Sequence, residues 1–398
     1  GARSLRARGA DPLKFERQPP RAIDAFTLQG GPLYRLGVRL GLVRGQRNTV
    51  RLGLAIGAVL WIVPAVLALA HGEALFNFAT LGAHVRLLVA IPLMFMAESL
   101  VDPRMNEVID IVVRSRIVPG KATSVLQSAL ARVARWKDHW LPEAVCLAVA
   151  IALYWVAPGL DLPGIDKSFR SASGAAQAAG VWYSVVCITA LRFLMLRWIW
   201  RLLLWLYCLW ILSRLPLRLL PTHPDGTGGL GQLDLVLTHF APLVLAISAV
   251  LSASFAVDIA SGAMAFETIY PAALAILLMH AILFIGPMLL FTPQLWACKV
   301  KGVSDYMLLA EKYTAGFEKK WVHGEQSMED LLGNSDIQSL ADLGTSIEVL
   351  HGMRIVPVSS RTLISLAIVA LLPLAPLVLF KVPLADLAAQ IIGRLTGG

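Results

Sequence analysis

The stretch LGLAIGAVLWIVPAVLALA, residues 52–70, carries no charged side chain. A helix of about 20 apolar residues is long enough to cross the hydrocarbon core of a bilayer, which is about 30 Å thick. Residues 146–160 are also uncharged, and residues 270–298 contain His280 but no Asp, Glu, Lys or Arg. The chain therefore repeats the pattern of a membrane-spanning helix.

The composition of the whole chain supports this interpretation. Of 398 residues, 57% are hydrophobic and 15% are charged, whereas soluble globular proteins have about 25% charged residues. We predict an all-α, polytopic membrane protein with about seven transmembrane helices, with six or eight as alternatives. The predicted spans are residues 51–71, 80–102, 140–158, 178–212, 235–257, 268–292 and 361–381.

The basic residues of the connecting segments orient these spans. The N-terminal segment through Arg51 holds eleven Lys and Arg residues, and residues 103–139 and 293–361 hold seven each, whereas residues 72–79 and 258–267 hold none. Because Lys and Arg in short loops stay in the cytoplasm, we expect a cytoplasmic N-terminus and a periplasmic C-terminus.

Four parts of the chain follow from this topology. They are a basic cytoplasmic segment (1–50), transmembrane helices one to six with the cytoplasmic helical loop 103–139 (51–292), a cytoplasmic helical region (293–360), and the last helix with its tail (361–398). The two cytoplasmic helical parts are expected to form a small cap on the membrane rather than a separate catalytic domain.

The formal net charge of +9 lies mostly on the predicted cytoplasmic face. Residues 34–51 predict an amphipathic surface helix whose arginines meet anionic phospholipid. An RNA-binding arm is the alternative, but the segment lacks interleaved aromatic residues, so no nucleic-acid partner is expected. The four cysteines form no C-x-x-C pair, and neither a metal site nor a cofactor is predicted from them.

Charged side chains inside predicted spans are costly and therefore mark functional candidates. Residues 181–214 carry Arg192, Arg197 and Arg201 beside several tryptophans. The arginines either line an anion path or bind lipid phosphate, or they mark the interface of a helix that continues along or beyond the membrane surface.

Acids and histidines are expected at the depth of these arginines. Glu98 and Glu143 lie near the cytoplasmic ends of their spans, and Asp234 and His239 open the fifth. Pairing with the arginines would offset the cost of desolvation, so structural ion pairs and a ligand site both remain open. His280, near the middle of the sixth span, either bonds a neighbouring helix or acts in proton transfer or gating.

Glycine and proline predict two features of the spans. Gly286–Pro287 indicates a kink that could serve as a hinge. Gly53-x-x-x-Gly57 permits close helix approach within the chain or between subunits, and a homo-oligomer is expected.

The polar loop PTHPDGTGGLGQLDL, residues 221–235, separates two apolar stretches. Gly228 and Gly229 allow close backbone approach just before a helix N-terminus, where anions bind. We expect this turn to pack against the arginine-bearing end of the fourth span. The anionic group is a lipid phosphate, a permeating anion or the carboxylate of Asp225 itself.

The same loop offers an alternative metal-binding set. His223 and Asp225 are too few to hold a metal alone, but Asp234 and His239 lie one and two turns into the following helix and could complete the ligands. The loop is not a phosphate-binding P-loop, because no Gly-Lys-Ser/Thr follows.

The stretches HPDGTGGLG (223–231) and DIQSLADL (336–343) resemble signature stretches of an uncharacterised bacterial multi-pass inner-membrane protein family. The span pattern is similar over most of the chain. The resemblance implies a location in the bacterial inner membrane and implies no reaction.

Recognisable enzyme motifs are missing from the sequence, including a nucleophile elbow, a Walker motif and H-E-x-x-H. We therefore favour an ion channel or small-solute transporter with a polar site on the cytoplasmic side and an anion or small solute as its ligand. A sensory or scaffold membrane protein is one alternative. A lipid-acting intramembrane enzyme is the other, and it is less favoured because no characteristic spacing supports it.

Overall fold

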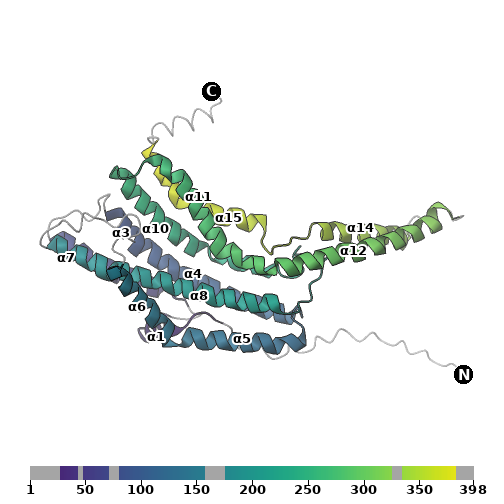
Figure 1. Cartoon of the computed structure of the whole chain (residues 1–398), viewed down its shortest axis with the longest axis horizontal. Coiled ribbons are helices and arrows are strands. Elements are labelled where there is room, and N and C mark those ends of the chain that lie inside the picture. The colour runs from purple at the N-terminus through teal and green to yellow at the C-terminus, as the bar shows by residue number, and fades with distance from the viewer. Residues whose placement is uncertain (1–26, 44–47, 71–79, 157–174, 325–333, 382–398) are drawn as a thin grey trace, which may run out of the picture.

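The computed structural model describes residues 27–43, 48–70, 80–156, 175–324 and 334–381. All regular elements in these ranges are helices (Figure 1). The α-helices are α1 (Gly31–Arg39), α2 (Val50–Ala70), α3 (Leu81–His84), α4 (Ile91–Arg114), α5 (Gly120–Asp138), α6 (Trp140–Val156), α7 (Ala175–Trp182), α8 (Ile188–Arg214), α9 (Gln232–His239), α10 (Ala241–Ala260), α11 (Ile269–His280), α12 (Thr292–Phe317), α14 (Ser335–His351) and α15 (Ser360–Leu371). The π-helical and 3₁₀ segments are η2 (Val85–Ala90), η4 (Tyr183–Cys187), η5 (Phe266–Thr268), η6 (Ala281–Ile285), η7 (Gly286–Phe291), η8 (Glu318–Val322) and η9 (Leu372–Phe380).

The prediction of an all-α membrane protein is confirmed. Six helices in the described ranges are long and apolar enough to cross a membrane: Val50–Ala70, Leu81–Arg114, Ala178–Arg214, Gln232–Ala260, Phe266–Val322 and Ser360–Phe380. A seventh span results if α5 and α6, which meet at a 50° bend, count as one. The predicted third span corresponds to α6, which has 17 residues and is therefore short for a full crossing.

Four of these helices are longer than a bilayer requires, and Gln232–Ala260, with 29 residues, is the shortest of the four. Leu81–Arg114 has 34 residues, Ala178–Arg214 has 37 and Phe266–Val322 has 57. At 1.5 Å per residue, 37 residues extend about 55 Å, against a hydrocarbon core of about 30 Å. The fourth span is therefore longer than the hydrocarbon core, which one of the two sequence interpretations requires, and α5 packs against α8.

The helical region after the sixth span extends away from the bundle (Figure 1). α12 continues directly from that span and pairs with α14 to form a two-helix arm that projects from the bundle (Figure 1). Asn334 caps α14 by accepting the N–H of Asp336, whose carboxylate in turn accepts from Lys320 Nζ at 2.6 Å and from Trp321 Nε1 at 3.0 Å. The arm projects because α-helix runs unbroken from Thr292 to Phe317.

Other predictions concern the two ends of the chain. Instead of one amphipathic helix over 34–51, α1 ends at Arg39 and Gly41 turns the backbone with φ 68° before α2 begins at Val50. Residues 1–26, most of the third loop and the tail after Lys381 lie outside the described residues.

Non-α segments interrupt four of the six candidate spans. The predicted kink at Gly286–Pro287 coincides with a change from the π-helical turn η6 to the 3₁₀ helix η7. Proline has no N–H to donate and its ring crowds the preceding turn, which favours a break at Pro287, whereas α2 and α4 continue through Pro64 and Pro103.

The two glycines of the first span bring α2 against the second span. A Cβ on Gly53 would lie 2.7 Å from Phe95 Cβ, and one on Gly57 would lie 2.4 Å from the carbonyl oxygen of Leu87. The predicted close approach is therefore made within the chain, where no larger residue fits.

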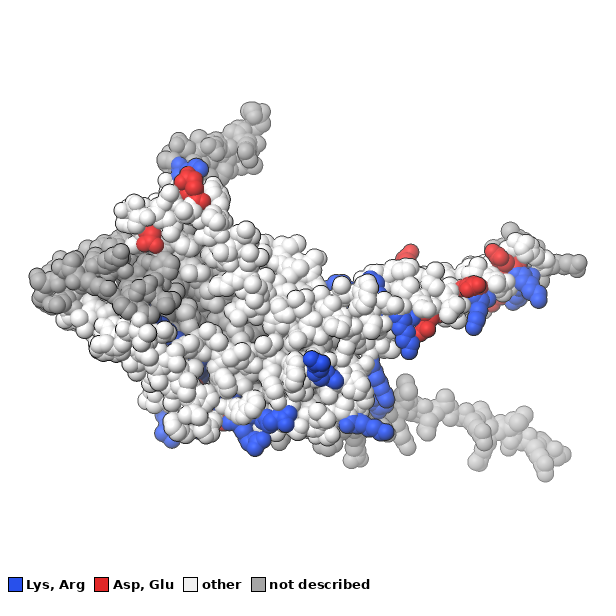
Figure 2. All heavy atoms as spheres, in the orientation of Figure 1, with Lys and Arg blue, Asp and Glu red and all other residues white. Residues whose placement is uncertain are grey.

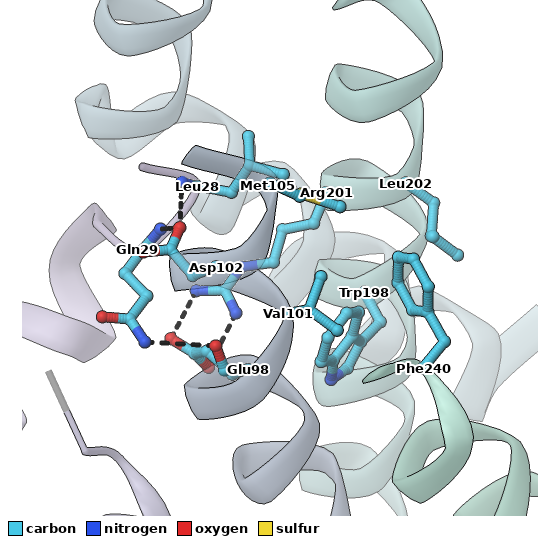
Figure 3. Close-up of a pocket in the computed structure, with 10 residues that line it drawn as sticks. All are labelled: Leu28, Gln29, Glu98, Val101, Asp102, Met105, Trp198, Arg201, Leu202 and Phe240. Atoms are coloured by element: carbon cyan, nitrogen blue, oxygen red, sulfur yellow. Dashed lines mark hydrogen bonds and ion pairs between the residues drawn. The ribbon is translucent and has the colours of Figure 1, made fainter. Parts of the chain in front are cut away.

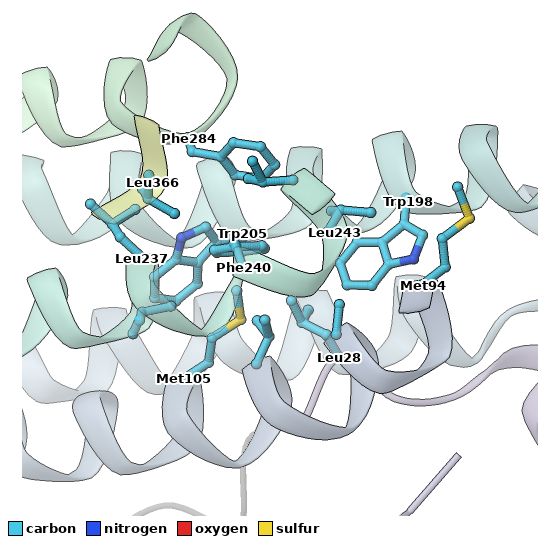
Figure 4. Close-up of a cluster of buried hydrophobic side chains, with 14 of the residues drawn as sticks. Leu28, Met94, Met105, Trp198, Trp205, Leu237, Phe240, Leu243, Phe284 and Leu366 are labelled. Carbon is cyan, nitrogen blue, oxygen red and sulfur yellow. The ribbon is translucent and has the colours of Figure 1, made fainter. Parts of the chain in front are cut away.

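Large apolar side chains fill the centre of the bundle (Figure 4). Trp198 and Trp205 of α8 are buried with Phe240, and Phe240 lies 5.0 Å from Phe284 of η6 between ring centroids. This packing fixes α8 against α4, α9 and η6, and so positions the charged side chains that α8 carries.

Candidate functional site

Four ionisable side chains from three helices meet inside the bundle. Arg197 of α8 donates from Nε to Oε1 of Glu143 on α6 at 2.9 Å, and from Nη1 to Oε2 of Glu98 on α4 at 3.0 Å. Arg201, about one turn further along α8, donates from Nη2 to Oε1 of Glu98 at 2.7 Å. We refer to Glu98, Glu143, Arg197 and Arg201 as the ion-pair cluster.

The cluster is almost completely shielded from solvent. Glu98 and Arg197 are each 3% exposed, Arg201 is 6% exposed and Glu143 is 9% exposed. Each buried charge costs several kcal/mol unless an opposite charge and hydrogen bonds offset it. The predicted pairing is confirmed for both glutamates, and the contact of Glu143 is with Arg197.

The segment that leads into α1, together with the first turn of that helix, covers the cluster from one side. In this N-terminal strap, residues 27–33, Thr27 Oγ1 donates to Asp102 Oδ2 at 2.7 Å, and the N–H groups of Leu28 and Gln29 donate to Asp102 Oδ1. The side chain of Gln29 donates to the carbonyl of Glu98 at 3.2 Å. The strap therefore fastens to the same face of α4 that carries the cluster.

Glu143 joins the cluster to the strap. Its Oε2 accepts the N–H of Leu33, in the first turn of α1, at 2.9 Å. A Cβ on Gly31, which has φ 86°, would lie 2.3 Å from Glu143 Oε1. Only glycine suits this position, because both the backbone conformation and the space exclude a side chain.

A small cavity separates the strap from the cluster (Figure 3). Its volume is about 20 Å³, and one water needs about 10–15 Å³ of such volume. The polar groups around it include the carboxylates of Glu98 and Asp102 and the guanidinium of Arg201. It thus has room and hydrogen-bonding groups for a single water or small ion.

A second polar group lies near the end of the bundle opposite the arm. Arg86 of η2 donates from Nη1 to the hydroxyl of Tyr183 in η4 at 2.9 Å, and from Nη2 to Ser254 Oγ of α10 at 2.8 Å. Arg86 is 1% exposed. It was missed as a candidate, although a lone arginine six residues into a predicted span was a visible signal.

The glycine-rich loop is closed around its own carboxylate. Asp225 Oδ1 accepts the N–H of Thr227 at 2.8 Å and of Gly229 at 3.1 Å, and Oδ2 accepts the N–H of Gly231 at 2.8 Å. Nδ1 of His223 lies 2.9 Å from Oδ1. Of the anionic groups considered from the sequence, the side-chain carboxylate occupies the turn.

These contacts lower the pKa of the Asp225 carboxyl group. Burial raises the pKa of Asp225. Hydrogen bonds from the N–H groups of Thr227, Gly231 and Gly229, and from His223, lower it by a larger amount, so the pKa lies below its ordinary value. The carboxylate is therefore a charged acceptor at neutral pH, which strengthens its hydrogen bonds.

The loop does not pack where it was expected. A Cβ on Gly229 would meet Ile117 at 2.9 Å, and one on Gly228 would meet Leu219 at 3.2 Å, while Arg354 donates to the carbonyls of Gly226 and Asp225. α8 runs on for 13 residues after Arg201, which is about 20 Å. The loop thus lies well beyond the arginines that it was predicted to contact.

The remaining candidates have separate roles. Asp234 accepts the N–H of Ser359 before α15 at 3.0 Å, and Nδ1 of His239 lies 2.6 Å from the carbonyl of Leu235. His280 is buried, and its Nδ1 lies 2.7 Å from the carbonyl of Ile276 in its own helix.

These positions do not support the alternative metal site. Asp234 and His239 do not join His223 and Asp225, and within the described ranges no group of three or more His, Cys, Asp or Glu residues could hold a metal ion. Arg192 is half-buried on α8, five residues before Arg197, and the contacts of the ion-pair cluster given above do not involve it.

Comparison with known proteins adds no relative: the chain matches no family model, no curated protein and no solved structure.

Proposed function

We propose that this integral membrane protein moves a small ionic solute across the membrane, with the ion-pair cluster on the solute path. The observation that carries the proposal is the burial of two arginines and two glutamates among helices long enough to span a bilayer. Intramembrane charges are expensive, and they line substrate or ion pathways in many membrane proteins.

Two further features support a path through the bundle. Arg86 places a second buried guanidinium toward the end opposite the arm, so charged groups occur at two depths. Irregular turns interrupt four spans, and broken helices are tolerated at membrane depth where they meet protein or a water-filled cavity. With a guanidinium at each depth, the solute is proposed to be an anion or a small molecule with an anionic group.

The proposed setting is the bacterial inner membrane, with the N-terminus and the arm in the cytoplasm and the C-terminus in the periplasm. Lys and Arg gather along the lower edge of the bundle, the arm carries both basic and acidic side chains, and acidic side chains lie at the upper end of the bundle (Figure 2). This asymmetry suits a cytoplasmic face against anionic phospholipid.

Reconstitution into liposomes tests the proposal. Vesicles with the purified protein are loaded with a pH-sensitive or halide-sensitive dye and challenged with gradients of protons, chloride, phosphate and small carboxylates. At least one of these ions is expected to cross faster than in protein-free vesicles. If every flux equals that of protein-free vesicles while the protein is inserted and folded, transport of a small ion is contradicted.

The arm favours a second candidate, a scaffold or sensory protein. Met307, Leu308 and Leu309 are each about half exposed on α12, outside the packed bundle. Such exposed apolar side chains mark interaction surfaces, and a homo-oligomer through the arm is compatible with either function. Cross-linking in native membranes distinguishes a second copy of the chain from a different protein.

A further inference from the structure

An apolar groove lies between three candidate spans near the end opposite the arm. Its volume is about 560 Å³, within the range of about 300–1,000 Å³ that ligand pockets occupy. The walls come from α3 with η2, from α10 and from η9, and the residues that matter to its shape are Val89, Ser252, Ala253, Ala256, Leu377 and Leu379.

Small residues of α10 make the floor. Ser252, Ala253 and Ala256 are each at most 6% exposed, whereas Val89 and Leu379 at the rim are each 41% exposed. A buried floor below an exposed rim means that the groove opens on the outer surface of the bundle. Because all three walls belong to helices that span the membrane, that surface faces lipid.

A hydrogen bond from α10 holds the third wall, the 3₁₀ helix η9, in its position. In a 3₁₀ helix the N–H of residue 376 would donate to the carbonyl of residue 373, but Pro376 has no N–H. The hydroxyl of Ser252 donates to that carbonyl instead, so the one polar group of the floor is engaged. The carbonyl is satisfied without water, and the groove surface is left apolar.

We propose that this groove binds one acyl chain of a membrane phospholipid. Apolar cavities stay free of water, and an empty groove would forfeit dispersion contacts along every wall. Lipid tails are as apolar as the wall, so hydrophobicity gives no preference for the groove over bulk lipid. An acyl chain prefers the groove to bulk lipid because it makes close contact along the groove walls and because its headgroup is bound at the mouth of the groove.

The mouth of the groove suits a phospholipid headgroup. Lys381 follows Phe380 of the groove wall, and its Nζ lies 5.4 Å from the ring centroid of Phe266 and 3.8 Å from Glu267 Oε1. Lys381 and Glu267 are both more than half exposed, and exposed pairs of this length bind weakly. The ammonium therefore remains accessible to a lipid phosphate at the end of the chain.

Photolabelling tests the site directly. The full-length protein is reconstituted with phosphatidylethanolamine carrying a diazirine on one acyl chain, irradiated and digested. Labelled peptides are expected from α10 and η9. Ala253→Phe, which fills the floor, is expected to lower labelling of these peptides about ten-fold, the effect of losing about 1.4 kcal/mol of binding.

Two controls separate this site from general lipid contact. Ala275→Phe makes the same change at an exposed position of α11 and is expected to leave labelling unchanged. Val89→Trp narrows the rim without altering the floor, so it gives the same test if Ala253→Phe does not fold. Equal labelling of wild type, Ala253→Phe and Val89→Trp, or labels spread evenly over all spans, would overturn the proposal.

Discussion

The carboxylate of Asp225 takes the place that a bound anion would have in a glycine-rich turn. Three backbone N–H groups, from Thr227, Gly229 and Gly231, converge on its two oxygens. At the scale of single residues, the N–H groups of this turn are therefore hydrogen-bonded by a carboxylate of the protein itself. The loop joins the end of α8 to α9.

Replacement of Asp225 by alanine should destabilise the fold by about 1–3 kcal/mol at pH 7, because buried N–H groups lose a charged acceptor. The folded-state pKa lies below the ordinary value of about 3.9. The contribution is therefore complete above about pH 4 and is lost as pH falls through the folded-state pKa. Unfolding in detergent at pH 7 and pH 3 measures it; an Asp225→Ala deficit that does not shrink at pH 3 contradicts this role.

Coupling within the ion-pair cluster is a second prediction at this scale. Glu98→Gln should destabilise strongly, because it removes the carboxylate that Arg201 contacts, and Arg201→Gln should destabilise because it removes one of the two guanidinium groups that pair with Glu98. The double variant should lose less than the sum, by about 0.5–3 kcal/mol. The exposed pair Arg104 and Glu107, also on α4, is the control and should couple by less than about 1 kcal/mol. Additive effects at Glu98 and Arg201 would refute the coupling.

At the scale of elements, the contact between α2 and the second span depends on glycine. Gly57→Ala places a Cβ against the backbone oxygen of Leu87 and should cost about 1–3 kcal/mol through overpacking. Gly316→Ala on α12 meets open space and should stabilise by up to about 1 kcal/mol through helix propensity. Thermal unfolding of both variants tests this; a Gly57→Ala protein as stable as wild type would show that the helices separate at little cost.

The elements also show what the sequence could predict. Uncharged runs identified the spans because burial in lipid demands them, and Arg197 and Arg201 were identified because charged side chains inside a span are costly. The partners of those arginines were among the acids proposed, but the choice between them depends on how α4, α6 and α8 pack, which no local pattern specifies.

Two features of the structure were not predicted. The strap binds Asp102 through two backbone N–H groups and one hydroxyl. Nearly every residue has a backbone N–H, so residue identity does not predict such hydrogen bonds. The arm was expected as a cap, because helical periodicity gives the length of a helix but not the direction in which it leaves the membrane.

At the scale of the whole molecule, the distribution of charge predicts how the chain sits in the membrane. Single cysteines at Ala263 and Thr345, both exposed, are introduced after the native cysteines are replaced. A membrane-impermeant maleimide added to intact cells should label position 263 and not 345, because Lys and Arg flank the arm and remain cytoplasmic. Labelling of both positions from outside would contradict the proposed orientation.

The most direct test of the account is ion flux through a cluster that has lost its Glu98–Arg201 ion pair and keeps the Arg197–Glu143 pair. In the double variant Glu98→Gln and Arg201→Gln, amide groups replace the ion pair, and Arg104→Gln with Glu107→Gln serves as the control. Once an ion that crosses the wild type is known, its flux in proteoliposomes should fall at least about ten-fold in the cluster variant, a barrier increase of about 1.4 kcal/mol, and stay near wild type in the control. A folded cluster variant that conducts as fast as wild type would show that the Glu98–Arg201 pair is structural and would contradict a solute path through it.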